Sequence, residues 1–192
     1  MSKAVMLSIR PQWCQKITSG EKTIEVRKTK PKMETPFKCY IYCTRDKHLA
    51  FMQNQTGTNL IACMNVDAAI PVGGAIGNGK VIGEFTCERI APITYDGGRL
   101  WCQTNAAFSP ATCLSQAEII AYIGDKGRCY GWHISDLLIY DQPRELSEFQ
   151  RATDPCDSCH AEYTWECTDC KKFGGNIKRP PQSWCYVDDA NA

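Results

Sequence analysis

The stretch GEKTIEVR, residues 20–27, joins the end of a helix directly to a charged strand. Its glycine suits the C-terminal cap of a helix over residues 11–19, which has a proline in its first turn. After the turn the residues alternate as in a strand from Thr23 to Arg27, so Thr23, Glu25 and Arg27 share one face. Lys22 lies in the turn itself, where strand alternation does not fix its direction.

This stretch has the chemistry of a polar binding or catalytic site. A carboxylate beside an ammonium and a guanidinium stays ionised and accepts hydrogen bonds from a base amino group or a ribose hydroxyl. The two cations suit a phosphate, or a developing oxyanion if a reaction occurs there. The alternative is an ion pair on the surface of an edge strand, which contributes little stability. The residues alone leave both interpretations open.

The patterning on either side of this stretch predicts further strands and one more helix. We expect strands over 38–44 and 79–90, a helix opened by the capping-box pair Ser115 and Glu118, and a closing strand over 129–140 with a bulge near 135–136. Loops are expected over 45–79 and 91–114, and one last helix could cover 144–152. Few helices among many strands indicate a mainly β, α+β domain, built as a small, partly open barrel with short helices at its ends.

Composition agrees with one globular domain and an appendage. The 192 residues are 43% hydrophobic, and a polar stretch after Pro143 separates a domain over 1–145 from a cysteine-rich tail over 146–192. No apolar run approaches the ~20 residues that span a bilayer, and the first residues lack a signal peptide, so we expect a cytoplasmic protein that does not bind membranes.

Charge is distributed unevenly along the chain. Residues 1–48 hold 11 Lys and Arg against 4 Asp and Glu, whereas the remainder holds 11 against 17. A basic first quarter suits an anionic partner such as a phosphate backbone. The alternative is an ordinary solvated face.

The octad matches the signature G-x-K-x-x-E-x-R, and the segments around it resemble the ASCH family. The matching segments are LSIRPQW (7–13), KCYIYCT (38–44), GKVIGEFTCERI (79–90) and CYGWHISDLLIYDQPREL (129–146). The chain most resembles uncharacterised ASCH proteins of phages and prophages in low-GC Gram-positive bacteria. These often end in a segment like RPPQSWCYV, found here at 179–187.

The resemblance implies a PUA-like β-barrel with a cleft beside the signature strand, which binds RNA or a modified nucleoside or nucleotide. By position, the candidate ligand-binding residues are Ser8, Arg10, Trp13, Gly20, Lys22, Thr23, Glu25 and Arg27. Lys22, Glu25 and Arg27 would line the cleft, and Ser8, Arg10 and Trp13 would form the opposite wall. Trp13 could stack on a base, although a lone tryptophan on a short helix also suits the core.

An enzymatic function is the alternative. Some ASCH proteins are amidohydrolases that deacylate N4-acylated cytidines with a threonine nucleophile, and others have been linked to RNA cleavage. The signature of the amidohydrolases has threonine where this chain has Glu25, so their activity is not carried over. If the chain is a hydrolase of an N-acylated nucleoside or of RNA, Lys22 and Glu25 are the candidate catalytic residues. A third possibility is an accessory protein whose partner is another protein.

The 13 cysteines divide into two groups. An odd number without an export signal argues against a disulfide framework. Cysteines in strand-like segments, such as Cys39, Cys43, Cys63 and Cys87, are expected to be small buried apolar residues.

The remaining cysteines suggest a structural zinc site in the tail. Cys156-x-x-Cys159 and Cys167-x-x-Cys170 form two knuckles, and four thiolates at paired spacing are typical of a closed tetrahedral Zn²⁺ site. His160 or Cys185 could replace one ligand, and the alternative is a tail with free thiols. Four cysteine ligands leave no open position, so the zinc would be structural.

Basic residues and an extended segment accompany these knuckles. Lys171, Lys172, Lys178 and Arg179 could add phosphate contacts. Pro180 and Pro181, followed by Trp184 and Tyr186, suggest a segment that docks back on the barrel.

The zinc assignment predicts that protein purified without chelators contains close to one zinc per chain, because a closed thiolate site binds the metal tightly. Elemental analysis of the purified protein measures this ratio. A zinc content far below one per chain would contradict the assignment of a zinc knuckle.

Overall fold

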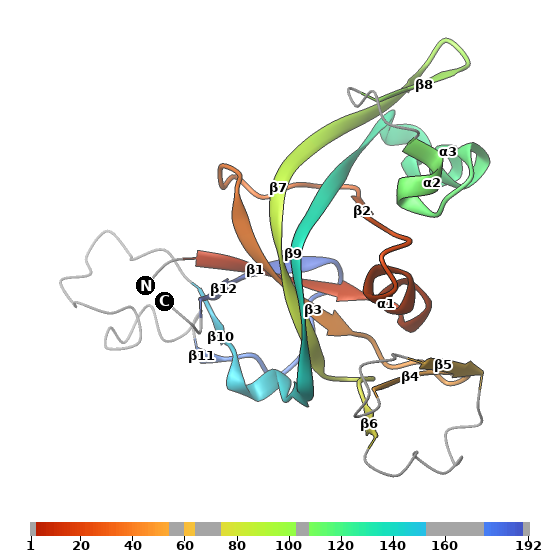
Figure 1. Ribbon diagram of the computed structural model, residues 1–192. Helices are drawn as coiled ribbons and strands as arrows, with labels where there is room; N and C mark the ends of the chain where they lie inside the picture. Colours follow the sequence, from red (N-terminus) through yellow and green to blue (C-terminus); the bar gives the residue numbers. More distant parts are fainter. Residues whose placement is uncertain (1–2, 54–59, 64–73, 103–107, 153–174, 190–192) are drawn as a thin grey trace, which may run out of the picture.

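The computed structural model describes residues 3–53, 60–63, 74–102, 108–152 and 175–189 (Figure 1). The elements in chain order are β1 (Lys3–Ile9), α1 (Pro11–Thr18), β2 (Ile24–Arg27), β3 (Phe37–Cys43), β4 (Leu49–Gln53), β5 (Leu60–Cys63), β6 (Ala75–Ile76), β7 (Val81–Asp96), β8 (Arg99–Cys102), α2 (Phe108–Thr112), α3 (Gln116–Ile123), the 3₁₀ turn η1 (Gly124–Lys126), β9 (Arg128–Arg144), the 3₁₀ turn η2 (Leu146–Glu148), β10 (Gln150–Arg151), β11 (Gly175–Asn176) and β12 (Trp184–Asp188). None of the described helices is long and apolar enough to cross a membrane.

A nine-stranded mixed sheet forms the body of the molecule. Its strand order is β11-β10-β12-β1-β3-β7-β9-β2, with β8 paired to β7. Strands β1 and β3 run parallel, and the other neighbours are antiparallel. The mainly β class with a few short helices is therefore confirmed.

Strands from both sides of residue 145 belong to this one sheet. β12 pairs with β1, from Lys3 opposite Asp188 to Leu7 opposite Trp184. β10 and β11 extend the sheet beyond β12. The division into a domain and a tail stays a prediction, because most of the cysteine-rich stretch lies outside the described residues.

A second, three-stranded sheet lies where a loop was expected. β4 pairs with β5 and β6 within residues 45–79. The side chain of Asn78 holds β4 in place: its Oδ1 accepts from the Phe51 N–H at 2.7 Å, and its Nδ2 donates to the Leu49 carbonyl at 2.8 Å. The sequence concealed these strands because they are short and are separated by stretches rich in Gly and Asn.

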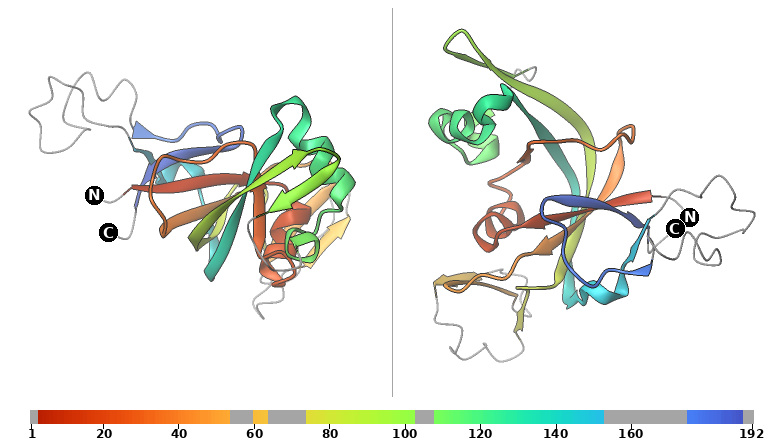
Figure 2. Two further views of the ribbon diagram at one scale, coloured as in Figure 1. Left: turned by 90° about the horizontal axis from the view of Figure 1, so that it is seen from above. Right: turned by 180° about the vertical axis from the view of Figure 1, so that it is seen from behind.

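The long strands β7 and β9 cross the whole molecule (Figures 1 and 2). β7 continues through residues 91–96, and β8 follows in a hairpin, so the irregular stretch expected over 91–114 is partly strand. The bulge in β9 is confirmed: Ser135 lies opposite Thr86, Leu138 lies opposite Glu84, and Asp136 has a φ of 46°.

The helices lie on the side of the sheet away from the two termini (Figures 1 and 2). α1 begins at Pro11 as predicted. The capping box of α3 is also confirmed, since the Glu118 N–H donates to Ser115 Oγ at 3.2 Å and the Ser115 N–H donates to Glu118 at 2.8 Å. The last helix considered over 144–152 is reduced to the short turn η2, followed by β10.

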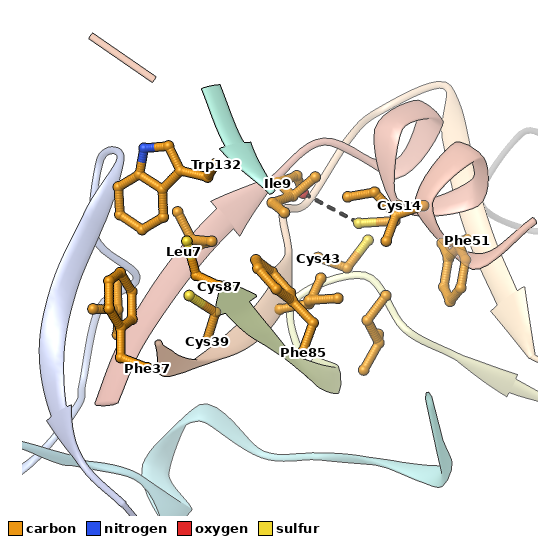
Figure 3. Packing of buried hydrophobic residues seen from close by; sticks show 14 residues of the cluster. Leu7, Ile9, Cys14, Phe37, Cys39, Cys43, Phe51, Phe85, Cys87 and Trp132 are labelled. Carbon is orange, nitrogen blue, oxygen red and sulfur yellow. Dashed lines mark hydrogen bonds between the residues drawn. The ribbon is translucent and has the colours of Figure 1, made fainter. Parts of the chain in front are cut away.

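The main core lies between the sheet, α1 and β4 (Figure 3). Trp132 is fully buried at its centre and meets the ring of Phe37 edge-on, with the centroids 5.8 Å apart. Cys39, Cys43 and Cys87 are fully buried in the same cluster, as expected of small apolar residues. The eight cysteines whose side chains the structure describes form no disulfide.

A smaller core under α3 contains a buried thiol that makes the folded state less stable at alkaline pH. Cys129 packs with Val26, Ile93, Ile119 and Ile123, and burial raises its pKa to about 12. An unfolded thiol ionises near pH 8.5, so above that pH the unfolded chain loses a proton that the folded chain keeps. The free energy of unfolding therefore falls as pH rises from about 9 toward 12.

We predict that Cys129→Ala reduces this pH dependence by up to about 1.4 kcal/mol per pH unit, the value for one proton. Urea unfolding at intervals between pH 8 and 11 measures the slope. Cys113→Ala, which removes a half-buried thiol, is the control and should leave the slope nearly unchanged. Equal slopes for wild type and Cys129→Ala would contradict the assignment.

Candidate functional site: a polar cleft beside strand β2

A cavity of about 480 Å³ opens beside the signature strand. Its walls come from the end of β1, the start of α1, strand β2, helix α3 and residues 180–182. Segments from both ends of the chain thus meet at one polar cleft.

The turn before β2 is fixed by main-chain hydrogen bonds on both sides. Gly20 has a φ of 77°, a conformation that glycine adopts without strain. The Lys22 N–H donates to the Lys16 carbonyl at 2.8 Å. The Thr23 N–H donates to Ala111, and the Thr23 carbonyl accepts from Ile134. These bonds set where the side chain of Lys22 enters the protein.

Lys22 lies against three groups in the floor of the cleft. Its side chain is 2% exposed, and its Nζ donates to the Thr112 carbonyl at 2.7 Å. The Nζ also lies 3.4 Å from Glu25 Oε2 and 5.2 Å from the centre of the Trp13 ring. The hydrogen bond, the ion pair and the ring together offset part of the cost of burying the charge.

Glu25 lies between two cations. Its Oε1 is 3.0 Å from Arg27 Nη2, and its Oε2 is the atom that faces Lys22. A carboxylate has about four acceptor positions, and these two contacts occupy one on each oxygen. Acceptor positions remain on a carboxylate that lines the cavity.

Arg27 connects β2 to the other end of the sheet. Its Nη2 donates to the Ser8 carbonyl at 2.8 Å, and its Nη1 donates to the Ser183 carbonyl at 3.2 Å. The Ser8 N–H donates to the same Ser183 carbonyl at 3.0 Å, and the Ser8 hydroxyl donates to the Pro181 carbonyl at 2.6 Å. β2 is the last strand in the sheet order and forms no ladder with β1, so this side chain replaces main-chain pairing.

The rim of the cleft is partly aromatic and partly charged. Arg10 is exposed at the start of α1, and Trp13 is half-buried one turn later. Tyr122 and Glu118 contribute from α3. Burial raises the pKa of the Tyr122 phenol, whereas hydrogen bonds from the Ser115 N–H and hydroxyl lower the pKa of Glu118.

Six of the eight residues that the sequence assigned to a ligand site line this cavity. They are Ser8, Arg10, Trp13, Lys22, Glu25 and Arg27. Gly20 and Thr23 are exposed and lie outside its lining. Thr23 does not follow the alternation expected of it, because β2 begins only at Ile24 and the residue before it is bound through its main chain.

Sequence reasoning missed the wall formed by α3. Tyr122 and Glu118 are about 100 positions from the signature, and no local pattern places their helix over β2. The prolines at 180 and 181, by contrast, did indicate from the sequence that this segment docks back on the domain. The structure places them at the cleft.

The proposed zinc ligands Cys156, Cys159, Cys167 and Cys170 lie outside the described residues. Within the described ranges, no group of three or more His, Cys, Asp or Glu side chains could hold a metal ion. The zinc knuckle therefore remains a prediction from the sequence.

No family model matches the chain, and no curated protein matches it significantly. Among solved structures, the chain is similar to an ASCH protein from Zymomonas mobilis, at 17% identity and a TM-score of 0.50, over 97% of this chain and 88% of that one. A mutant of that protein, with one tyrosine replaced by phenylalanine, matches at 18% identity and a TM-score of 0.51, over 98% and 92% of the two chains. The chain thus shares its fold with an ASCH protein, as expected from the sequence.

We predict that Arg27→Met lowers the free energy of unfolding by about 3–5 kcal/mol, because it leaves buried acceptors and part of the Glu25 charge unpaired. Urea unfolding followed by tryptophan fluorescence measures the loss. Lys28→Met removes the same charge at the next position, which is exposed, and should cost less than about 1 kcal/mol. Similar losses for the two variants would show that Arg27 does not hold β2 in place.

Proposed function

We propose that this ASCH-like domain binds RNA or a modified nucleotide, with one base held in the cleft beside β2. The observation that carries the proposal is the Glu25 carboxylate, which lines the cavity between two cations and keeps unused acceptor positions. A carboxylate in this position can accept from the exocyclic amino group of a base.

The cleft also suits the size and shape of a nucleotide. Its volume of about 480 Å³ lies within the ~300–1,000 Å³ typical of small-ligand sites. Trp13 and Tyr122 offer rings on which a base can stack.

Charge in the cleft favours an anionic ligand. Three cations line the cavity, Arg10, Lys22 and Arg27, against two carboxylates, Glu25 and Glu118, so the lining has a net charge of +1. Arg10 is exposed and forms no ion pair with the described residues, so its guanidinium is available to a phosphate.

The contacts of the buried Lys22 ammonium favour a binding function over a hydrolytic one. Its ammonium already contacts a carbonyl, a carboxylate and an aromatic ring, so a proton transfer would have to break those contacts. Thr23, the hydroxyl residue within the signature octad, lies outside the cavity lining. Hydrolysis of an N-acylated nucleoside or of RNA through Lys22 and Glu25 is the alternative.

Two finer features belong to the same proposal. The octad at 20–27 and the segment at 179–187 support a relationship to the ASCH proteins of phages and prophages. The paired cysteines of the tail support a structural zinc knuckle beside the domain.

Fluorescence anisotropy with a short single-stranded RNA tests the proposal. We expect Arg10→Ala to weaken binding about tenfold, because it removes one charge-assisted phosphate contact. Arg99→Ala removes the same exposed side chain from β8, outside the cavity lining, and should have little effect. Lys22 and Arg27 are unsuitable for this comparison, because their removal disturbs buried charge pairs.

Absence of binding by the wild-type protein, or equal weakening by Arg10→Ala and Arg99→Ala, would argue against the cleft as the binding site. Incubation with N4-acetylcytidine, followed by chromatography, tests the alternative. Release of acetate by the wild-type protein would favour the hydrolase.

A further inference from the structure

Two short basic segments carry five exposed cations and no acidic residue. The loop KTKPKM at 28–33 contributes Lys28, Lys30 and Lys32, and KRPPQS at 178–183 contributes Lys178 and Arg179. None of the five forms an ion pair with a residue in the described part of the chain. By contrast, Lys38, Lys80 and Arg144 each pair with a carboxylate.

The loop at 28–33 lies beside β12, the strand that follows the second segment, although the two are about 150 positions apart in the sequence. The Trp184 Nε1–H donates to Thr29 Oγ1 at 2.9 Å, and the Lys32 N–H donates to the Tyr186 hydroxyl at 2.8 Å. The loop is therefore held along β12 by hydrogen bonds in two places.

Both segments border the cleft. Lys28 directly follows Arg27, and its Nζ lies 5.1 Å from the centre of the Tyr122 ring, which lines the cavity. Arg179 directly precedes Pro180, which also lines the cavity. Lys30 lies 5.9 Å from the centre of the Tyr130 ring. Free cations thus approach the cleft from two sides.

We propose that residues 28–32 and 178–179 form a basic track that binds the backbone phosphates of a single-stranded polynucleotide, with the cleft holding one of its bases. This inference rests on the proposed function. It specifies that the ligand is a single-stranded polynucleotide rather than a free nucleotide. Five unpaired cations in addition to Arg10 exceed what the phosphate of one nucleotide can use.

Aromatic rings beside the cations favour a polynucleotide over an acidic protein. Lys28 and Lys30 lie over Tyr122 and Tyr130, and Trp13 lines the cleft. Basic grooves with interleaved aromatic side chains bind single strands by combining phosphate contacts with base stacking.

The test compares a labelled ten-nucleotide RNA with a ribonucleoside monophosphate. Anisotropy measures RNA binding across a salt series, and calorimetry measures binding of the monophosphate. We expect Lys28→Ala/Lys30→Ala/Lys32→Ala to lower the slope of log affinity against log salt by about 2, since each phosphate contact on a single strand contributes ~0.7. The affinity for the monophosphate should change less than twofold.

A matched variant separates the track from general charge. Arg99→Ala/Lys126→Ala/Arg128→Ala also removes three exposed cations, located on β8, η1 and the start of β9. We expect it to change the slope by less than a third of the effect of the lysine variant. All six positions are exposed, so both variants should keep the wild-type melting temperature.

The outcomes distinguish this inference from the proposed function. Equal affinity of the wild type for RNA and monophosphate, with equal slopes, would overturn the track and leave the cleft as a nucleotide site. Equal slope changes in the two triple variants would also overturn the track. Displacement of the RNA by poly-glutamate at equal charge concentration would assign the surface to an acidic protein. Failure to bind either RNA or monophosphate would overturn both proposals. A DNA strand of the same sequence shows whether the sugar matters.

Discussion

The guanidinium of Arg27 joins parts of the sheet that no hydrogen-bonded ladder connects. It holds β2 to the end of β1 and to the residue before β12, and through Glu25 it holds the turn that carries Lys22. The cleft exists because this side chain brings β2 back toward β1 without pairing the two strands. A main-chain ladder would have filled the same space with backbone.

The contacts among the signature residues therefore have two roles: they hold β2 in place, and they form the charged floor of the cleft. Lys22, Glu25 and Arg27 are all buried, and their charges are balanced mainly against one another. Burial of ions is costly unless their partners are held in place, so these contacts fix the three side chains. The polar floor of the cleft is therefore rigid, whereas Arg10 at its rim is exposed.

The sequence predicted the local features well because local chemistry determines them. The proline that opens α1, the capping box at Ser115 and the bulge beside Asp136 each depend on residues within a few positions. The sheet of β4, β5 and β6 was missed because short strands between Gly-rich stretches carry little periodic signal. The α3 wall of the cleft was missed for another reason: it depends on tertiary packing, which no window of sequence contains. The predicted face of Thr23 was wrong because alternation holds only inside a regular strand.

The pairing of β12 with β1 also has a consequence for synthesis on the ribosome. β1 cannot complete its pairing until β12 has been synthesised. The hydroxyl of Ser8, for example, donates to a carbonyl 173 positions later. At ~5–20 residues per second that interval is roughly 9 to 35 seconds. During this time β1 has one open edge and the cleft lacks its C-terminal wall. The cleft beside β2 is therefore complete only when translation has passed β12.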